Sequence, residues 1–191
     1  DVENMDAGLV ALQVTATDGD GDTNSATSEL GSRIDFEDDG PVISPGTVDQ
    51  TLSTDDDDVP AASATTSYAG AFDTSDVGSD GLASVTYELG VAAGLIVDSG
   101  LDDALLGDSI LLRINGDGQV EGYLENATST IAFTISVIES GANAGDVTIL
   151  RERAIKHDND MDPDEIGAEA EMMSATNLVT LTATATDNDG D

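Results

Sequence analysis

Two short runs of aspartate carry the side chains in this sequence that are best suited to binding a metal ion. One run is Asp18-Gly-Asp20-Gly-Asp22, and the other is Asp187-Asn-Asp189-Gly-Asp191. Acids at every second position of a tight turn direct several oxygens towards a common centre, and calcium takes about six to eight hard oxygen ligands. We therefore predict a calcium site in each of the two turns.

The alternative is that both runs are ordinary solvated turns. Bare carboxylates a few ångströms apart repel one another, however, and a bound cation removes that repulsion. The spacing of the first run matches positions 1, 3 and 5 of an EF-hand loop, and Glu29 falls at position 12, but Thr23 stands where that loop needs glycine. Strands rather than helices flank the turns. Only the ligand chemistry is therefore shared with EF-hands, and we interpret the position of Glu29 as a coincidence.

Other acidic segments differ in their predicted roles. A further loop with an acid at every second position is predicted to bind calcium; its carboxylates are Asp158, Asp160, Asp162 and Asp164. Asp38 and Asp39 precede Gly40-Pro41 at a domain junction, where bridging of two domains through a metal and a solvated pair are equally good explanations. The run 55–58 is interpreted as a solvated loop. Turn geometry alone explains Asn115 and Asp117.

The elements that must position the two main turns are alternating strands, and the sequence contains them twice. The segments 9–22 and 178–191 match without a gap at an offset of 169 residues, from Leu9 to Leu178. Self-similarity at a fixed distance indicates a repeated unit. We therefore predict that residues 1–39 are the C-terminal hairpin of one repeat, followed by an acidic linker, and that residues 40–191 form a second repeat. The final return strand of that repeat, the counterpart of 24–36, is expected to lie outside this sequence.

Alternation of apolar and polar residues predicts further short strands. They are expected at 66–73, 83–89, 94–97, 109–114, 119–124, 130–138 and 147–155, with a hairpin turn at 115–118 and a short helix or irregular crossover at 166–173. Many short strands with glycine- and aspartate-rich turns are typical of an all-β sandwich. Its core should be aliphatic, because aromatic residues make up only 3% of the chain. The large core members are expected to be Phe36, Phe72, Phe133, Tyr68, Tyr87 and Tyr123.

The charge balance argues against two classes of partner. The 191 residues include 40 acidic and only 5 basic ones, which gives a formal net charge of −35. Nucleic acids and anionic membranes are bound through basic patches, so neither is expected as a partner. Such a chain repels itself unless something neutralises it, and divalent cations are the simplest neutraliser.

The absence of cysteine excludes disulfides and thiolate zinc sites. No apolar run reaches the roughly 18 residues of a membrane-spanning helix.

Three segments of the sequence resemble the long extender repeats of repeats-in-toxin (RTX) adhesins, which Gram-negative bacteria export by type I secretion to the cell surface for biofilm formation. The segments are 14–43, 150–165 and 181–191, in which Thr-Ala-Thr-Asp-x-Asp-Gly-Asp is combined with Phe-x-Asp-Asp-Gly-Pro. The resemblance implies immunoglobulin- or cadherin-like β-sandwich modules in tandem, stiffened by calcium ions, each serving as an extracellular spacer whose partners are the neighbouring repeats. It implies loop ligands at Asp18, Asp20, Asp22, Asp187, Asp189 and Asp191, and linker ligands at Asp38 and Asp39. The family's Gly-Gly-x-Gly-x-Asp nonapeptide does not occur in this sequence.

Two rival functions remain open. A terminal adhesin domain that binds a glycan, ice or a peptide is the first, although three Phe and three Tyr offer few aromatic contacts and such a domain is not expected in tandem. The second is an enzyme. The sole histidine, His157, has no cysteine partner, and Asp98-Ser99-Gly100 resembles an aspartic-protease triplet without a clear second copy. We therefore predict that the chain is not an enzyme.

Overall fold

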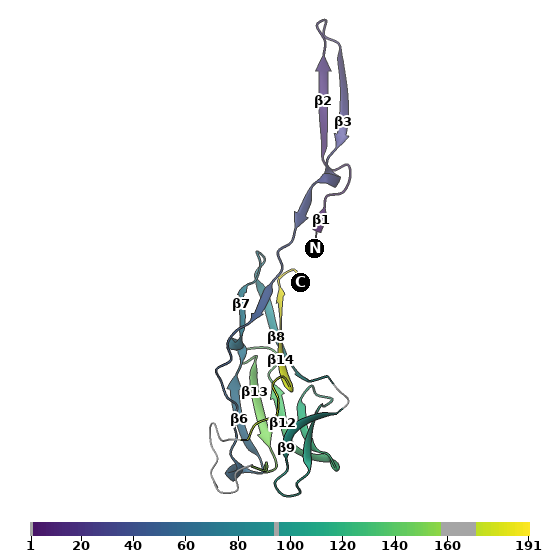
Figure 1. Cartoon of the computed structure of the whole chain (residues 1–191). Helices are drawn as coiled ribbons and strands as arrows, with labels where there is room; N and C mark the ends of the chain where they lie inside the picture. The colour runs from purple at the N-terminus through teal and green to yellow at the C-terminus, as the bar shows by residue number, and fades with distance from the viewer. Residues whose placement is uncertain (1, 94–95, 158–170) are drawn as a thin grey trace. The chain divides into compact units, whose positions relative to one another are not determined.

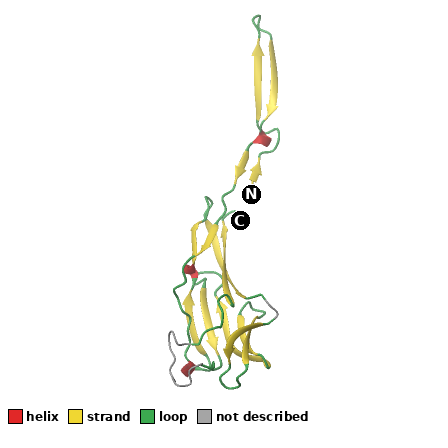
Figure 2. Cartoon of the chain, in the orientation of Figure 1, coloured by secondary structure: helices red, strands yellow, loops and turns green. Residues whose placement is uncertain are grey.

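The computed structural model describes residues 2–93, 96–157 and 171–191, and these consist almost entirely of strands and loops (Figures 1 and 2). The helices in this part of the chain are three single 3-10 turns: Gly31–Arg33, Asp56–Asp58 and Ala69–Ala71. The described residues contain no helix with the length and apolar character needed to cross a membrane. The predicted all-β class is therefore confirmed.

The chain divides into two compact units, Asp1–Gly40 and Pro41–Asp191, one residue away from the boundary expected from the sequence. The first unit contains two antiparallel strand pairs: β2 (Ala11–Thr17) with β3 (Thr23–Glu29), and β1 (Val2–Asn4) with β4 (Asp35–Glu37). The single return strand predicted at 24–36 is wrong, because the turn Gly31–Arg33 divides it into β3 and β4. A Cβ atom at Gly31 would lie 2.6 Å from the Asp6 carbonyl oxygen, so the chain turns where only glycine fits.

The apolar face of β2 is exposed. Leu12 and Val14 alternate along the strand as predicted, yet 54% and 60% of their surfaces are accessible. The expectation of a half-buried strand is therefore wrong for this unit, because two strand pairs offer no second layer to cover one face. Phe36 on β4, 55% exposed, is for the same reason not a core residue.

The second unit is built around a six-stranded antiparallel sheet with the strand order β6-β13-β12-β11-β10-β9, of which β6, β9, β12 and β13 are labelled in Figure 1. Its strands are β6 (Ala62–Ser67), β9 (Val97–Asp102), β10 (Ser109–Ile114), β11 (Val120–Leu124), β12 (Ala127–Val137) and β13 (Asp146–Arg151). Strands β9 to β13 follow one another in chain order, which makes this part a meander. Immunoglobulin sandwiches are built of Greek keys instead.

Two strand pairs form the second layer of this unit: β8 (Leu82–Val91) with β14 (Val179–Asp187), and β5 (Val42–Pro45) with β7 (Phe72–Asp76). Strand β8 packs against β10, β11 and β12, and β14 contacts β5. Two layers of antiparallel strands with apolar residues between them are a β-sandwich, so the predicted architecture is confirmed.

The core lies between these layers and is mostly aliphatic, as expected from the composition. Phe133 is its largest fully buried member, with 2% of its surface accessible, and Tyr87 is buried as well. Phe72, Tyr68 and Tyr123 are only half-buried. The rest of the cluster is Leu89, Val97, Leu101, Ile110, Leu112, Val120, Leu124, Ala132, Ile135, Val147 and Ile155.

Most predicted strands of this unit are present, and the hairpin turn at 115–118 joins β10 to β11 as predicted. Two strand positions are wrong. The predicted strand 66–73 is replaced by β6 and β7, which a 3-10 turn separates. Of the strand predicted at 94–97, residues 94 and 95 lie outside the described residues, and β9 begins at Val97 and continues to Asp102. The prediction stopped at Val97 because the buried Ser99 interrupts the apolar alternation of β9. The crossover predicted at 166–173 lies largely outside the described residues.

Candidate metal centre

The first aspartate run forms the turn of the β2–β3 hairpin. The pair Thr17↔Thr23 closes the ladder, and the Asp18 N–H donates to the Asp22 carbonyl oxygen at 3.0 Å. Gly21 has a φ of +103°, a backbone conformation that glycine adopts without steric cost. The run is therefore a tight turn, and three carboxylate side chains project from this short stretch of chain.

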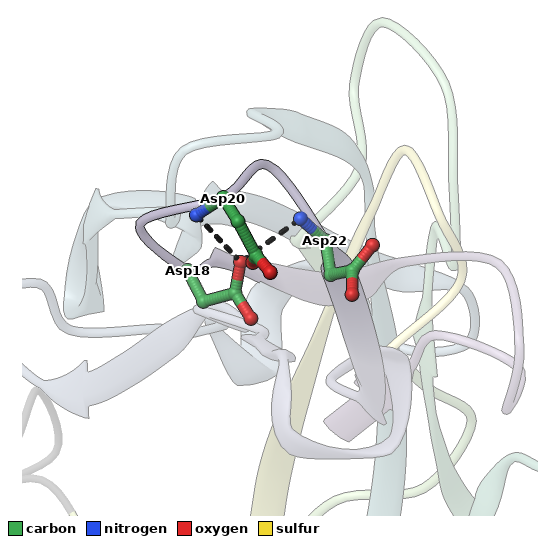
Figure 3. A group of neighbouring side chains, drawn as sticks. All are labelled: Asp18, Asp20 and Asp22. Carbon is green, nitrogen blue, oxygen red and sulfur yellow. Dashed lines mark hydrogen bonds between the residues drawn. The ribbon is translucent and has the colours of Figure 1, made fainter.

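The Asp18 carboxylate organises this turn (Figure 3). Its Oδ1 atom accepts the backbone N–H groups of Asp20, Gly21 and Asp22 at 3.3, 3.1 and 2.9 Å. The adjacent Asp20 carboxyl, which can share a proton with Asp18, and these N–H donors lower the pKa of Asp18. Asp18 is therefore ionised at neutral pH and its position is fixed before any ion arrives.

Asp18, Asp20 and Asp22 can each offer one carboxylate oxygen such that all three atoms lie within 4.8 Å of one another. All three residues are exposed, so water and ions reach them freely. Like charges at such separations repel. The donor set consists only of hard anionic oxygens, the kind that calcium and magnesium bind, and it fits the predicted cation.

The second run, in the other unit, repeats the turn. The Asp187 N–H donates to the Asp191 carbonyl oxygen at 3.2 Å, and Gly190 has a φ of +106°. Oδ1 of Asp187 accepts the N–H groups of Gly190 and Asp191, both at 2.9 Å. The neighbouring Asp189 carboxyl and these donors lower the pKa of Asp187. The sequence repeat is therefore also a repeat of hydrogen bonding.

The two turns differ in the burial of their first aspartate. Asp18 is exposed, whereas only 2% of the surface of Asp187 is accessible. The Oδ2 atom of Asp187 is buried and accepts no hydrogen bond from the described residues. A buried carboxylate oxygen without a partner is costly, and it points to a cation as its missing partner. Asp187 is therefore a candidate ligand, although among the described residues its carboxylate is not part of a group of three acids whose oxygens lie within 4.8 Å of one another.

Glu29 has a different role from the other acids of its unit. Its Oε1 accepts the N–H groups of Gly8 and Ser32 at 3.2 and 3.1 Å, and its Oε2 accepts the Ser32 hydroxyl at 2.7 Å. It holds the turn after β3, which agrees with the interpretation that its EF-hand-like spacing is a coincidence.

The other predicted ligands are Asp38, Asp39 and the acids of the loop 158–164. Among the described residues, neither Asp38 nor Asp39 forms a cluster of three acids with residues of its own unit. The Asp39 N–H donates to Oδ1 of Asp38 at 2.9 Å in the segment after β4, and their bridging role stays a prediction. Residues Asp158, Asp160, Asp162 and Asp164 lie outside the described residues.

The Oδ1 atom of Asn115 accepts the N–H groups of Asp117 and Gln119, so turn geometry explains Asn115 and Asp117 as predicted.

The interpretation of 55–58 as a solvated loop is wrong for Asp56. This half-buried carboxylate forms an ion pair with the buried Arg151 of β13, and Nε2 of His157 lies 3.6 Å from its Oδ2. Sequence reasoning missed the pair because its partners are almost a hundred residues apart and an isolated acidic run carries no sign of them. His157 therefore lies beside a structural ion pair.

The protease-like triplet at 98–100 is structural as well. The buried Ser99 hydroxyl donates to the Ile110 carbonyl oxygen at 2.6 Å and accepts the Leu101 N–H at 3.1 Å. Oδ1 of Asp98 accepts the Gly100 N–H at 2.9 Å. The bond between Ser99 and Ile110 joins β9 to β10, and the other two bonds lie within β9, so the triplet has a structural role.

Comparison with known proteins gives one match. The sequence profile of a family described as "Domain of unknown function (DUF5801)" matches residues 49–191, which is three-quarters of the chain. Neither a curated protein nor a solved structure matches the chain.

Proposed function

The chain belongs to the DUF5801 family, a domain family of unknown function, and we propose that it is a calcium-stabilised spacer from the extender region of a large bacterial RTX adhesin. One observation carries this proposal. The same strand leads into the same acidic turn, with the same backbone hydrogen bonds, at Asp18 and at Asp187. A feature that recurs at an offset of 169 residues suits a tandem structural array better than a single catalytic or binding site.

Calcium would act in this module through linkage between binding and folding. Extracellular calcium modules bind at about 10⁻⁴ to 10⁻³ M, and a ligand that binds only the folded state stabilises it by RT ln(1 + [L]/Kd). At 1 mM calcium each site contributes roughly 0.4 to 1.4 kcal/mol, and at 10 mM roughly 1.4 to 2.7 kcal/mol. Several sites together would convert a self-repelling chain with a net charge of −35 into a stiff one.

The proposed ligands follow from the two turns. Asp187, whose Oδ2 is buried and unpartnered, would supply one site together with its sequence neighbours Asp189 and Asp191. Asp18, Asp20 and Asp22, whose oxygens can lie within 4.8 Å of one another, would form the other. The resemblance to RTX extender repeats adds Asp38 and Asp39 as linker ligands and the loop at 158–164 as a further site. It also implies a module outside the cell on a Gram-negative bacterium, where calcium would be plentiful, with neighbouring repeats as its partners.

Thermal unfolding of the full chain in 10 mM calcium and in chelator tests the proposal. Each filled site should raise the melting temperature by roughly 3 to 10 °C for a chain of this size. Magnesium at the same concentration, with ionic strength held constant, separates coordination from general screening of negative charge. Asp187→Asn should lose part of the calcium-specific increase, whereas Asp117→Asn, an exposed turn acid outside both triads, should keep it. Equal melting temperatures in calcium and in chelator would remove the calcium proposal.

A terminal ligand-binding adhesin domain is the alternative function. The feature that favours it is an open hollow of about 340 Å³ lined by Thr86, Tyr87, Glu88, Gly118, Glu139, Ser140 and Thr184. Binding on a glycan array that Glu139→Gln abolishes, without a change in melting temperature, would support this alternative over the spacer.

A further inference from the structure

The two acidic turns differ at their second position, which is Gly19 in the first unit and Asn188 in the second. Nothing lies within 4 Å of the Cβ position of Gly19, so no described segment approaches the first turn at this point. The Nδ2 group of Asn188, in contrast, donates to the carbonyl oxygens of Asp80 and Gly81 at 2.7 and 3.1 Å. One side chain therefore ties the second turn to the loop 77–81, which joins β7 to β8.

The ladder between β8 and β14 brings the end of this loop to the first aspartate of the turn. Thr186 pairs with Ser84 and Asp187 with Leu82, so Ala83 is an additional residue of β8 at this point. Such a bulge changes which residues face each other at the end of a strand pair. Leu82, which directly follows the loop, consequently lies opposite Asp187.

The burial of the two first aspartates differs in the way these contacts require. The ladder of β2 ends at Thr17↔Thr23, one residue before the exposed Asp18, whereas Asp187 lies inside its ladder and is 2% exposed. The Oδ2 atom of Asp187 is buried and has no hydrogen-bond partner among the described residues. This oxygen gave up its water when the chain folded, so a cation that binds it displaces none and is attracted more strongly than in bulk water.

We propose that Asn188 is a positioning residue for the cation site at Asp187 and that it couples the loop 77–81 to the bound ion. By holding the loop against the turn, the Asn188 amide keeps the Asp187 carboxylate in place and shielded from water. Loss of that amide should let the loop separate from the turn and weaken the binding of the ion. This inference rests on the proposed calcium site and adds the residue that assembles it.

Calcium titration of the full chain, followed through its backbone amide NMR signals, reports each turn separately. The Gly190 and Gly21 N–H groups donate to the first aspartate of their respective turns. In the wild type the amides of the loop 77–81 should shift with the same midpoint as Gly190. In Asn188→Ala the calcium midpoint of Gly190 should rise about two- to tenfold, the range that one net hydrogen bond accounts for. The loop signals should then no longer follow calcium.

Two further variants separate the amide from other effects of the substitution. Gly19→Ala is the matched control, because it places alanine at the same position of the turn that lacks the link, and it should leave the midpoints of Gly21 and Gly190 unchanged. Asn188→Gly copies the first turn and should raise the Gly190 midpoint as Asn188→Ala does. The signals of β10 to β12 confirm in each sample that the larger sheet is folded.

The outcomes keep this inference distinct from the calcium proposal. Calcium-dependent shifts in both turns with an unchanged Gly190 midpoint in Asn188→Ala overturn the role of Asn188 and leave the calcium proposal standing. A lower melting temperature of this variant in chelator, with that midpoint unchanged, likewise makes Asn188 a structural residue only. Signals of Gly190 and Gly21 that do not respond to calcium overturn the calcium proposal itself, and this inference with it.

Discussion

Arg153 binds both oxygens of the Asp103 carboxylate: its Nε donates to Oδ1 at 2.6 Å and its Nη2 to Oδ2 at 2.9 Å. Asp103 has no exposed surface, and its Oδ2 also accepts the N–H groups of Leu105 and Leu106 at 3.2 and 2.8 Å. One buried carboxylate thus holds the turn after β9 and ties it to the segment after β13. Protein groups alone satisfy this aspartate, in contrast to Asp187.

Replacing the arginine of this ion pair by a neutral residue should strongly destabilise the fold. In Arg153→Gln the buried Asp103 carboxylate loses its partner, which costs about 3 to 5 kcal/mol. Arg113→Gln is the matched control, because Arg113 pairs with Glu121 at the surface, where its side chain is 41% exposed. The loss there, including its contact with the Tyr123 ring, should be about 1 kcal/mol. Urea unfolding of both variants measures the difference, and equal losses would contradict a structural role for the buried pair.

The same pair predicts an acid-sensitive component of stability. The hydrogen bond from Arg153, ahead of smaller contributions, lowers the pKa of Asp103 below its ordinary value of 3.8. Because the folded-state pKa is the lower one, the stabilisation is complete above the unfolded value and is lost as the pH falls through the folded value. The difference in unfolding free energy between the wild type and Asp103→Asn should therefore be constant near neutrality and shrink below about pH 4. A difference that grows towards low pH would reverse the assigned sign.

Gly122 and Phe133 give a prediction about packing. A Cβ atom at Gly122 would lie 2.4 Å from Cε1 of the Phe133 ring, which is buried across the strand pair β11–β12. Gly122→Ala should therefore force the ring to move and cost about 1 to 3 kcal/mol. Gly116→Ala is the control, because nothing lies within 4 Å of its Cβ position. Thermal unfolding of both variants checks this, and a Gly122→Ala protein as stable as Gly116→Ala would show that the ring can move freely.

The acidic turn of the first unit gives a prediction about conformation. Gly21 has a φ of +103° with open space around its Cβ position, so Gly21→Ala strains the backbone without a steric clash, by about 1 kcal/mol. Gly19 has equally open surroundings and no such φ, so Gly19→Ala should be neutral. In calcium, exchange of the β2 and β3 amides should be faster in Gly21→Ala than in Gly19→Ala. Identical exchange in the two variants would mean that the turn tolerates other conformations.

Short sequence patterns predicted much of this fold. Most of what they missed depends on contacts between residues that are far apart in the sequence. Alternation located β8, β10, β12 and β14, and Asn115-Gly116 located the hairpin between β10 and β11. The break at Gly31 was missed because it depends on the approach of the Asp6 carbonyl. The continuation of β9 beyond Val97 was missed because the buried Ser99, whose hydroxyl donates to the Ile110 carbonyl oxygen, looks polar in sequence.

The candidate metal ligands were predicted from their spacing, and the structure adds a distinction that spacing does not contain. Asp18 and Asp187 are equivalent in sequence and in their backbone hydrogen bonds, yet only Asp187 is buried. Burial depends on what packs around a turn, and an acidic repeat carries no sign of that. The ion pairs of Asp56 and Asp103 were missed for the same reason, since Arg151 and Arg153 lie far away along the chain.

The meander of β9 to β13 has a consequence for how the second unit folds. Each of these strands pairs with the next one in the chain, so the ladder grows by closing short loops, which costs little entropy and favours a low folding barrier. Strands β6 and β14 pair with residues about 80 to 105 positions away. The meander is thus suited to be the folding nucleus, onto which the two distant strands condense late.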